Sequence, residues 1–415
     1  MRPIKIMKTI FIFIVSLALS AISLPSQAQK FPDLANTPPM GWNSWNKFGC
    51  NIDEKLVRAT ADAMVKTGMK DAGYQYINLD DCWHGNRDAD GFIQADAKRF
   101  PSGMKALADY VHGQGLKIGI YSDAGKQTCG GKPGSQGYEY QDAKQYARWG
   151  IDYLKYDWCN TGEGTAQRNP REAYTTIRDA VFAAGRPIVL SICEWGESKP
   201  WEWAGRVAHL WRTSSDIANC WECEHGHGSW SSLGVLNTLD KQAGLRKYAH
   251  PGQWNDPDMM QVGNLPSLNE NRAHFGLWAM LAAPLFVGTD LREMSDEIRT
   301  VVTNKDVIAV DQDELGIQGF PALKSRNVEI WAKPLVGGDW AVAVLNRSEA
   351  PQVIQHDWAL HPLEDDVSGR GADFSKTVFT IKDIWTGKLV GNTVASLSVT
   401  VQAHDLLMYR LKAEE

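Results

Sequence analysis

The stretch "GIDYLKYDWCN", Gly150 to Asn160, combines the composition of a buried strand with two charged side chains. Lys155 and Asp157 are two residues apart, so in a strand they point to the same face. Charged groups are rarely buried unless they are paired, and buried ion pairs contribute little to stability. The pattern therefore favours a functional role at the end of a buried strand, with Lys155 keeping Asp157 ionised.

Similar apolar runs recur along the chain, and amphipathic, helix-like segments separate them. Including the opening stretch there are eight: "PMGWNSW", "YQYINLDDCW", "KIGIYSD", "YLKYDWC", "PIVLSICEW", "LWRTSSDI", "GQWNDPDMM" and "APLFVGTD". Intervening segments such as "DEKLVRATADAMVKTGMKDAG" end on glycine, as helices often do. Strand–helix alternation repeated eight times predicts an α/β fold, a closed parallel (β/α)8 TIM barrel rather than an open sheet.

After about residue 318 the pattern changes to a period of two. Runs such as "WAVAVLNR" and "KTVFTIKDIW" occur without long helices, which predicts an antiparallel β-sandwich of about 90 residues. We therefore expect a catalytic barrel over residues 31–316 and a C-terminal β-sandwich over residues 317–415.

The N-terminus has the pattern of a secretory signal peptide over residues 1–28. Basic residues precede the apolar run "TIFIFIVSLALSAISL", and small residues follow it in "PSQAQ". Because the run is short for a bilayer span, we expect cleavage, no stable membrane span afterwards, and an exported protein, periplasmic or extracellular. Export favours disulfides among the seven cysteines, and their odd number leaves at least one unpaired.

Composition narrows the class of ligand. The net charge is −6 and no block of basic residues occurs, so nucleic acid is not expected as a partner. The 17 tryptophans are an unusual number. Indole faces pack well against the C–H faces of sugars, so this richness favours a carbohydrate ligand, with an aromatic-rich core as the alternative.

Acidic residues gather where the predicted barrel strands end: Asp80, Asp81, Asp123, Asp157, Glu194, Asp216 and Asp258. In such barrels these strand ends build the active site. A glycosidase needs a carboxylate nucleophile and a second carboxyl that acts as acid and then as base. Asp157 suits the first role, and from spacing alone Asp81, Asp216 and Asp258 are nearly equal candidates for the second. A Schiff-base role for Lys155 is disfavoured, because so many carboxylates hold its amine protonated.

Two clusters have a metal-binding alternative. The doublet Asp80–Asp81 suits paired sugar hydroxyls, and although hard cations also take such oxygens, no regular ligand spacing surrounds it. The segment "NCWECEHGHGSW" places Cys220, Cys223, His225 and His227 close together, which superficially resembles a zinc cluster. Because the segment is very compact and export is expected, disulfide pairing of the two cysteines, locally or elsewhere, is favoured over zinc.

Several long motifs accompany the opening stretch, among them "TPPMGWNSWNKFGCNI", "DAGYQYINLDDCW", "WNDPDMMQVGN", "APLFVGTDLR" and "DVIAVDQDELGIQG". Together they resemble glycoside hydrolase family 27, the α-galactosidase (melibiase) family, from about Asn36 to the C-terminus. The resemblance implies a (β/α)8 barrel followed by a β-sandwich. It also implies an exo-acting, retaining hydrolase for α-galactoside substrates that uses no metal or organic cofactor.

The resemblance assigns roles to single residues. The nucleophile falls on Asp157 and the acid/base on Asp216, and in a retaining enzyme the two carboxyls lie about 5–5.5 Å apart. Disulfides fall on Cys50–Cys82 and Cys129–Cys159. Sugar-binding roles fall on Trp45, Asp80, Asp81, Tyr121, Lys155, Arg212, Asp258 and Met259.

The segment "SICEWGESKPW" bears on specificity, because it supplies Cys193, Glu194 and Trp195 to the predicted pocket. Relatives acting on N-acetylgalactosamine have small residues beside the sugar's 2-position, whereas Trp195 resembles the galactose-type pocket. Relatives preferring β-L-arabinopyranose alter the aspartate doublet, which is intact here. An α-N-acetylgalactosaminidase, a β-L-arabinopyranosidase and a catalytically silent carbohydrate-binding relative are the alternatives.

Two features depart from the family pattern. The approach to the predicted acid/base reads "RVAHLW" and offers no cysteine, so Cys193 is expected to be a free thiol at the pocket wall. The loop "ANCWECEHGHG" after Asp216 has no counterpart in the pattern, which leaves the preference for the leaving group open.

Overall fold

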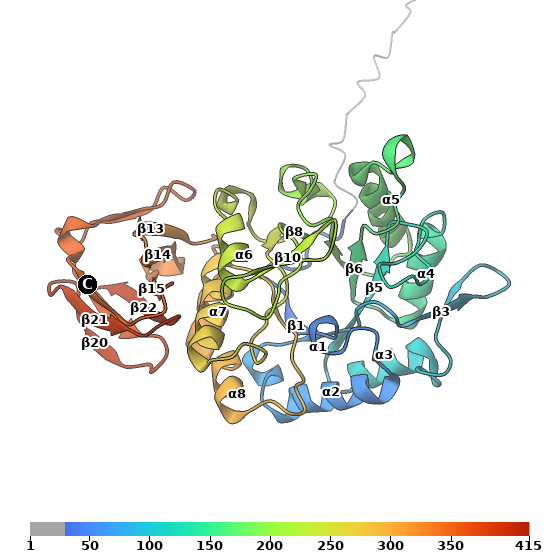
Figure 1. Cartoon of the computed structure of the whole chain (residues 1–415), viewed down its shortest axis with the longest axis horizontal. Coiled ribbons are helices and arrows are strands. Elements are labelled where there is room, and N and C mark those ends of the chain that lie inside the picture. Colours follow the sequence, from blue (N-terminus) through green and yellow to red (C-terminus); the bar gives the residue numbers. More distant parts are fainter. Residues whose placement is uncertain (1–29, 415) are drawn as a thin grey trace, which may run out of the picture.

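The structure is a computed structural model that describes residues 30–414, so the predicted signal peptide lies outside the described residues. Its larger part is the predicted parallel barrel (Figure 1). The eight strands are β1 (Met40–Asn43), β2 (Tyr76–Asn78), β5 (Lys117–Asp123), β6 (Tyr153–Asp157), β7 (Val189–Ile192), β8 (Leu210–Arg212), β11 (Trp254–Asp256) and β12 (Leu285–Val287). They lie in the order β11-β8-β7-β6-β5-β2-β1-β12, and Met260, just after β11, bridges Val287 of β12 and closes the ring.

Helices cover the outside of the barrel between most of its strands. They are α2 (Glu54–Lys66), α3 (Gly103–Gly113), α4 (Glu139–Trp149), α5 (Pro170–Ala183), α6 (Val235–Lys241), α7 (Leu268–Leu281), α8 (Asp296–Val302) and α9 (Lys305–Asp311). Several begin at a side-chain cap that satisfies a free backbone N–H, such as Asp53 for α2 and Ser267 for α7. None of these helices is long and apolar enough to cross a membrane, as judged over residues 30–414.

The eightfold alternation fails at one place. Between β7 and β8 the chain forms only the short 3-10 helices η3 (Pro200–Glu202) and η4 (Ala204–Arg206). The loop that follows β7 occupies residues 193–199. Residues 200–209 complete the connection to β8, and they include proline and glycine, which do not support a longer helix. The prediction of a helix after every strand is wrong here because this connection is too short.

Aromatic side chains fill the lower part of the barrel interior. Tyr153 packs against Tyr76 and Phe286, with ring centroids 5.6 and 5.4 Å apart. Tyr153, Lys155 and Asp157 alternate along β6 and so share its inward face. Because Tyr153 occupies the floor, the two charged side chains lie successively closer to the C-terminal end of the barrel.

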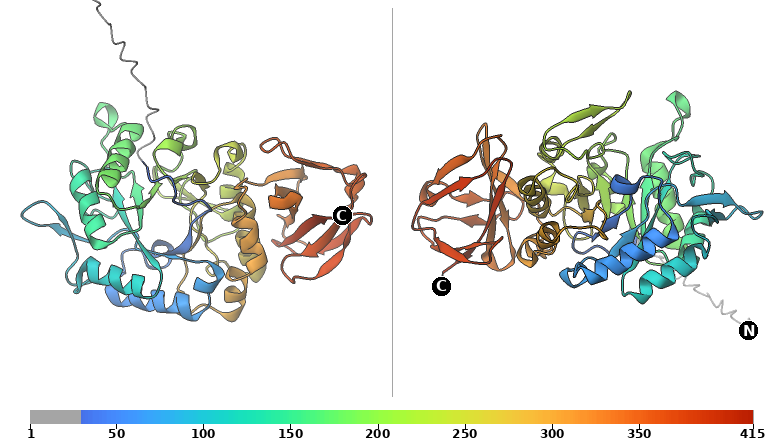
Figure 2. Two further views of the ribbon diagram at one scale, coloured as in Figure 1. Left: turned by 180° about the vertical axis from the view of Figure 1, so that it is seen from behind. Right: turned by 60° about the horizontal axis from the view of Figure 1, so that its bottom comes forward.

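Three small elements of the barrel loops lie outside the predicted pattern. The first loop contains the short helix α1 (Trp45–Phe48), and the second contains the hairpin β3 (His84–Arg87) and β4 (Ile93–Ala95). After β8 a second antiparallel hairpin forms, β9 (Glu224–Gly226) and β10 (Ser231–Leu233). This second hairpin projects from the barrel in the right view of Figure 2.

The C-terminal part is the predicted antiparallel sandwich. Its main sheet has the order β13-β14-β15-β22-β19-β20, and the pairs β16–β21 and β17–β18 complete it. The strands are β13 (Phe320–Lys324), β14 (Val328–Pro334), β15 (Trp340–Asn346), β16 (Gln352–His356), β17 (Leu363–Glu364), β18 (Gly371–Ala372), β19 (Phe379–Asp383), β20 (Leu389–Asn392), β21 (Leu397–Val401) and β22 (Leu406–Ala413). Trp340, Trp358 and Phe374 belong to its own buried core.

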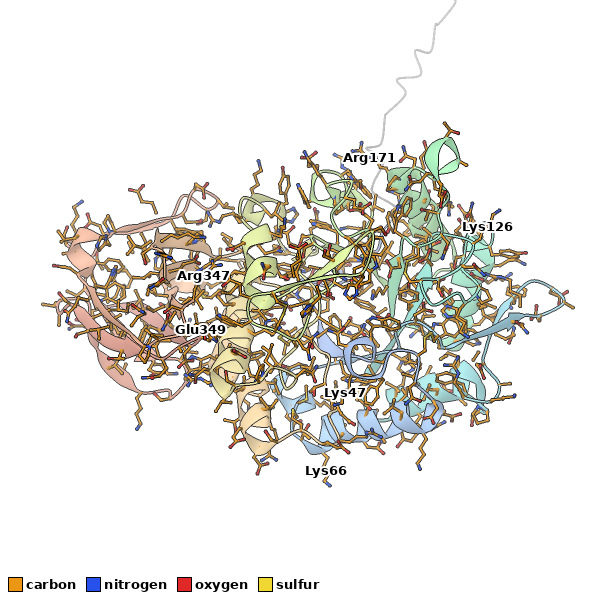
Figure 3. The ribbon with its side chains drawn as sticks, viewed as in Figure 1. Lys47, Lys66, Lys126, Arg171, Arg347 and Glu349 are labelled. Carbon is orange, nitrogen blue, oxygen red and sulfur yellow. A yellow bond between two sulfur atoms is a disulfide. The ribbon has the colours of Figure 1, made fainter. Side chains whose placement is uncertain are left out.

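The sandwich packs against α7 on the side of the barrel (Figures 1 and 2). Gly276 permits the close approach, because a Cβ there would lie 2.5 Å from Leu406 of β22. The buried ammonium of Lys333 donates hydrogen bonds to the carbonyls of Ala279 and Val310 on the barrel side. Arg347, labelled in Figure 3, pairs with Asp240 across the same boundary at 2.7 Å. The barrel and the sandwich are therefore fixed to each other by both apolar packing and charge.

Candidate active site

Asp157 lies at the C-terminal end of β6 and is 5% exposed. Burial raises the pKa of its carboxyl, and the nearby carboxylates of Asp216 and Asp80 add to this rise. The Lys155 ammonium opposes the rise and holds the pKa lower than burial alone would. Both carboxylates, those of Asp216 and Asp80, are therefore near enough for their charges to act on Asp157.

The ion-pair partner of Lys155 is Asp80 rather than Asp157. The ammonium lies 2.9 Å from Asp80 Oδ2, and the same oxygen accepts a hydrogen bond of 2.8 Å from Asn43 Nδ2. The expectation of a direct Lys155–Asp157 pair is therefore corrected: Lys155 bridges β6 to the end of β2 and acts on Asp157 through its charge. A sequence cannot show this, because the pair joins residues 75 positions apart.

The aspartate doublet follows β2, and its two members face different neighbours. Asp81 Oδ2 accepts a hydrogen bond of 2.6 Å from the backbone N–H of Gly130. No side chain fits at Gly130, since a Cβ there would lie 2.8 Å from that oxygen. Asp80 is held by Lys155 and Asn43 as described above, so both carboxylates are buried with defined orientations.

Asp216 is not at the end of a strand, which corrects the expectation from the sequence. β8 ends at Arg212, and Asp216 lies in the loop four residues later. Arg212 Nη2 holds both Asp216 Oδ1, at 3.0 Å, and Asp258 Oδ2, at 2.9 Å. The Asp216 side chain is 37% exposed, whereas the Asp258 side chain is 6% exposed. Of the two, only Asp216 is freely accessible from solvent.

The segment after β7 forms another part of the site. Cys193 is a buried free thiol, and Arg212 Nη1 lies 3.6 Å from its sulfur. Burial and the charge of Asp157 raise the pKa of this thiol well above its ordinary value. Glu194 Oε2 accepts a hydrogen bond from the backbone N–H of Ser198, and burial raises the pKa of Glu194 to about 7. Trp195 has a positive φ of 56° and packs partly buried against the barrel core.

Several buried polar atoms at these strand ends have no hydrogen-bond partner among residues 30–414. They include Glu194 Oε1, Arg212 Nε and Ser214 Oγ. Such atoms are costly to leave unpaired, and in a native structure they call for an explanation. Their grouping around the predicted pocket fits a site that takes a polar ligand.

The other predicted sugar-binding residues line the same end of the barrel. Trp45 on α1 and Met259 after β11 pack on the aromatic cluster of the barrel interior. Tyr121 on β5 is buried, with the Lys155 ammonium 5.2 Å from its ring centroid. Asp258 has a φ of 104°, and strained backbone of this kind is typical of binding sites.

Asp123, also a strand-end carboxylate, is fully buried and is held by the backbone. Its two oxygens accept hydrogen bonds from the backbone N–H groups of Gly125 and Cys159. It therefore ties the end of β5 to the residues after Asp157.

Asn43 was missed by the sequence reasoning although it lies in the quoted motif "GWNSW". Its hydrogen bond to Asp80 is the signal that identifies it.

The disulfides Cys50–Cys82 and Cys129–Cys159 are confirmed. A third joins Cys220 and Cys223, which is the local pairing among the alternatives that the sequence left open. His225 Nε2 lies 3.3 Å from Cys223 Sγ, and His227 Nε2 lies 3.0 Å from Ser232 Oγ.

Comparison with known proteins agrees with this architecture. The family described as "Alpha galactosidase A" matches residues 37–313, and its "C-terminal beta sandwich domain" matches residues 325–411. Alpha-galactosidase A of Cellvibrio japonicus is 58% identical over 390 residues, covering 94% of this chain and 95% of that protein. The α-galactosidase of Cyamopsis tetragonoloba is 45% identical over 382 residues, covering 91% and 87%.

Solved structures give the same result. Alpha-galactosidase I of Mortierella vinacea superimposes with a TM-score of 0.83 at 35% identity, covering 92% of this chain and 98% of that one. The α-galactosidase of Saccharomyces cerevisiae with raffinose superimposes with a TM-score of 0.85 at 29% identity, covering 94% and 100%. The chain is thus a glycoside hydrolase that belongs to the α-galactosidase family, glycoside hydrolase family 27.

Proposed function

We propose that this α-galactosidase removes terminal α-linked D-galactose by double displacement, with Asp157 as the nucleophile and Asp216 as the acid and base. The observation that carries this proposal is the contrast between the two carboxyls. Asp157 is buried on the inner face of β6 near the Lys155 ammonium, whereas Asp216 is partly exposed on a loop. A nucleophile needs a fixed position, and an acid/base needs access to the leaving group and then to water.

In the first step an Asp157 oxygen forms a bond to the anomeric carbon as the bond to the leaving oxygen breaks. Asp216 gives its proton to that oxygen. In the second step Asp216 takes a proton from water, whose oxygen attacks the anomeric carbon and displaces Asp157. Two inversions leave the α configuration unchanged. A carboxyl separation of about 5–5.5 Å is the geometry expected for this route.

Recognition of galactose is assigned to the buried charged groups around the nucleophile. Asp80 and Asp81 accept hydrogen bonds from the axial 4-hydroxyl and the 6-hydroxyl. Arg212, Asp258 and Glu194 supply the polar groups elsewhere around the ring, and Trp45, Tyr121, Cys193 and Met259 supply contacts to its apolar faces. A site built around buried hydrogen-bonding groups rejects a sugar that leaves one unpaired by as much as about 10⁴-fold.

Galactose is favoured over the related sugars because of two features. Trp195 fills the side of the pocket where an acetamido group would need room, and the aspartate doublet for the 6-hydroxyl is intact. Both catalytic carboxyls are present, which disfavours a silent binding protein. We also propose export through the signal peptide over residues 1–28, since three disulfides suit an oxidising compartment.

The proposal is tested by comparing the 4-nitrophenyl glycosides of α-D-galactose, N-acetyl-α-D-galactosamine and β-L-arabinopyranose. We expect kcat/KM for the galactoside to exceed the other two by about 100-fold or more. Proton NMR of the first product formed should show α-galactose before mutarotation. A preference for the acetamido sugar would overturn the role given to Trp195, and β-galactose as first product would exclude double displacement.

A further inference from the structure

A second carboxyl lies beside the proposed nucleophile, at the end of the neighbouring strand. In the parallel register of β5 and β6, Asp123 is paired directly with Asp157. The N–H of Ala124, the next residue, donates to the carbonyl of Asp157 at 2.9 Å. The two carboxyls therefore occupy matching positions on adjacent strands, although no catalytic or sugar-binding role is assigned to Asp123.

Two consecutive backbone N–H groups after β6 donate to these two carboxyls. The N–H of Trp158 donates to Asp157 Oδ1 at 3.0 Å, and the N–H of Cys159 donates to Asp123 Oδ2 at 2.9 Å. The first hydrogen bond orients the carboxylate of Asp157. The second fixes the residue that directly follows the donor of the first. The orientation of Asp157 therefore depends on Asp123 through two residues of backbone.

The Asp123 side chain is itself held in place. It is fully buried, and its Oδ1 accepts a hydrogen bond of 2.6 Å from the N–H of Gly125. Gly125 lies close against the residues that follow Asp157, because a Cβ at this position would overlap the carbonyl oxygen of Cys159. The carboxyl of Asp123 thus joins two loops that are already in contact, and it has little freedom to move.

Stability alone does not account for a carboxyl at position 123. Its hydrogen bonds come from backbone N–H groups rather than from a cation. Burial and the charge of Asp157 raise the pKa of Asp123 well above its ordinary value, so the ionised form is disfavoured here. A second acidic group beside the nucleophile is therefore a cost to the fold, and groups of this kind are concentrated at functional sites.

We propose that Asp123 is a positioning residue for the nucleophile: it fixes the backbone at Cys159 and so keeps the Trp158 N–H aimed at Asp157. The inference rests on the proposed function, because it takes Asp157 as the nucleophile. Attack on the anomeric carbon requires the carboxylate oxygen to be held in a narrow range of positions. A misplacement of about 1 Å can lower the rate about 100-fold.

The loop that orients Asp81 has supports that do not involve the Asp123 side chain. Gly130, which donates to Asp81, lies next to the Cys129–Cys159 disulfide that anchors this loop. Asn160 Nδ2 also donates to the carbonyls of residues 127 and 128, at 3.2 and 3.0 Å. Removing the Asp123 carboxyl should therefore disturb the nucleophile more than the groups assigned to galactose binding. A loss of kcat with retained galactose affinity distinguishes positioning from a general loss of structure.

The test uses Asp123→Asn and Asp123→Ala with 4-nitrophenyl α-D-galactoside as the substrate. Asparagine keeps one of the two acceptor oxygens and alanine keeps neither, so we expect kcat to fall roughly tenfold and roughly 100-fold, respectively. The inhibition constant of free galactose should change less than about threefold. Calorimetric titration with galactose counts the binding-competent sites, and kcat is expressed per such site, which corrects for any misfolded fraction.

Covalent trapping measures the nucleophile separately from turnover. With 5-fluoro-α-D-galactosyl fluoride, an oxygen of Asp157 forms a bond to the anomeric carbon as the anomeric fluoride leaves with its bonding electrons. The mass of the intact protein reports the rate of trapping. In the two variants this rate should fall by a factor similar to that for kcat.

Asp365→Asn is the matched control, because Asp365 is a buried carboxylate of the sandwich that also accepts a backbone N–H, from Ser368 at 2.8 Å. It should lower stability and leave both kcat and trapping unchanged. In the Asp123 variants, an unchanged kcat, or equal losses of kcat and galactose affinity, would overturn the positioning role. If the wild-type protein neither hydrolysed the galactoside nor was trapped, the proposed function itself would fail, which is a distinguishable outcome.

Discussion

The two sides of the site differ in how they are built. On the side of Asp157, the groups lie on or next to strands β2, β5 and β6, and they are buried, paired and braced by two disulfides. On the side of Asp216, they lie on loops after β8, where the carboxyl is 37% exposed and a hairpin follows. In the proposed mechanism the strand side recognises the galactose ring and the loop side faces the leaving group. Loops on a rigid barrel commonly carry functional residues.

The largest effect should come from the strand side. Asp157→Asn removes the nucleophile while keeping its shape, so we expect kcat to fall roughly 10⁴-fold or more. Galactose binding should be retained, because the surrounding charged groups are unchanged. Steady-state kinetics and calorimetric titration with galactose measure the two quantities. An unchanged rate would refute the assignment of Asp157.

The effect of Asp216→Ala should depend on the leaving group. Raffinose needs a proton on its departing oxygen, so we expect kcat/KM to fall about 10³-fold, within the range for lost general acid–base catalysis. On galactosyl fluoride, kcat/KM should fall much less, since fluoride needs little protonation. The ratio of the two losses is the measurement. The same loss on both substrates would contradict the role of Asp216 as the acid.

Replacing Lys155 should change the pH dependence as well as the rate. Asp157 must be ionised to attack, its pKa is raised by burial, and Lys155 opposes that rise. In Lys155→Met the pKa of Asp157 increases further, so the acidic limb of the kcat/KM profile should move to higher pH. The variant also leaves Asp80 buried without its cation, and breaking such a pair costs about 3–5 kcal/mol. A limb that stayed in place or moved to lower pH would contradict the electrostatic role of Lys155.

The smallest effects concern the stability of the fold, and they come from removing one disulfide on each side of the site. Cys129 and Cys159 close a loop with a sequence separation of 30, whereas Cys220 and Cys223 are separated by 3. By loop-closure entropy, replacing the first pair by alanine costs about 3.5 kcal/mol and the second about 1.5 kcal/mol. Denaturant unfolding measures both. We expect the first replacement to lower the free energy of unfolding more than the second, and the opposite ranking would contradict this comparison of the two sides.

The sequence predicted the strand side well and the loop side poorly, for physical reasons. Strand ends carry a strong local signal, because apolar runs stop at charged residues, and this located Asp157, Asp80 and Asp81. Lys155 was assigned the wrong partner, since alternation along one strand gives the face but not the neighbouring strand. The β9–β10 hairpin was missed as an element because its composition also resembles a metal cluster. The roles of Asp157 and Asp216 came from the family resemblance rather than from spacing alone.

The most direct test of the central claim is rescue by azide in two matched variants. In Asp157→Gly, azide can enter from the side of the missing nucleophile, and we expect β-galactosyl azide from an activated α-galactoside. In Asp216→Gly, the galactosyl–Asp157 intermediate still forms, so azide should yield α-galactosyl azide. Opposite anomers in the two variants are the predicted result, read by NMR. The same anomer from both, or the reverse assignment, would contradict double displacement by these two carboxyls.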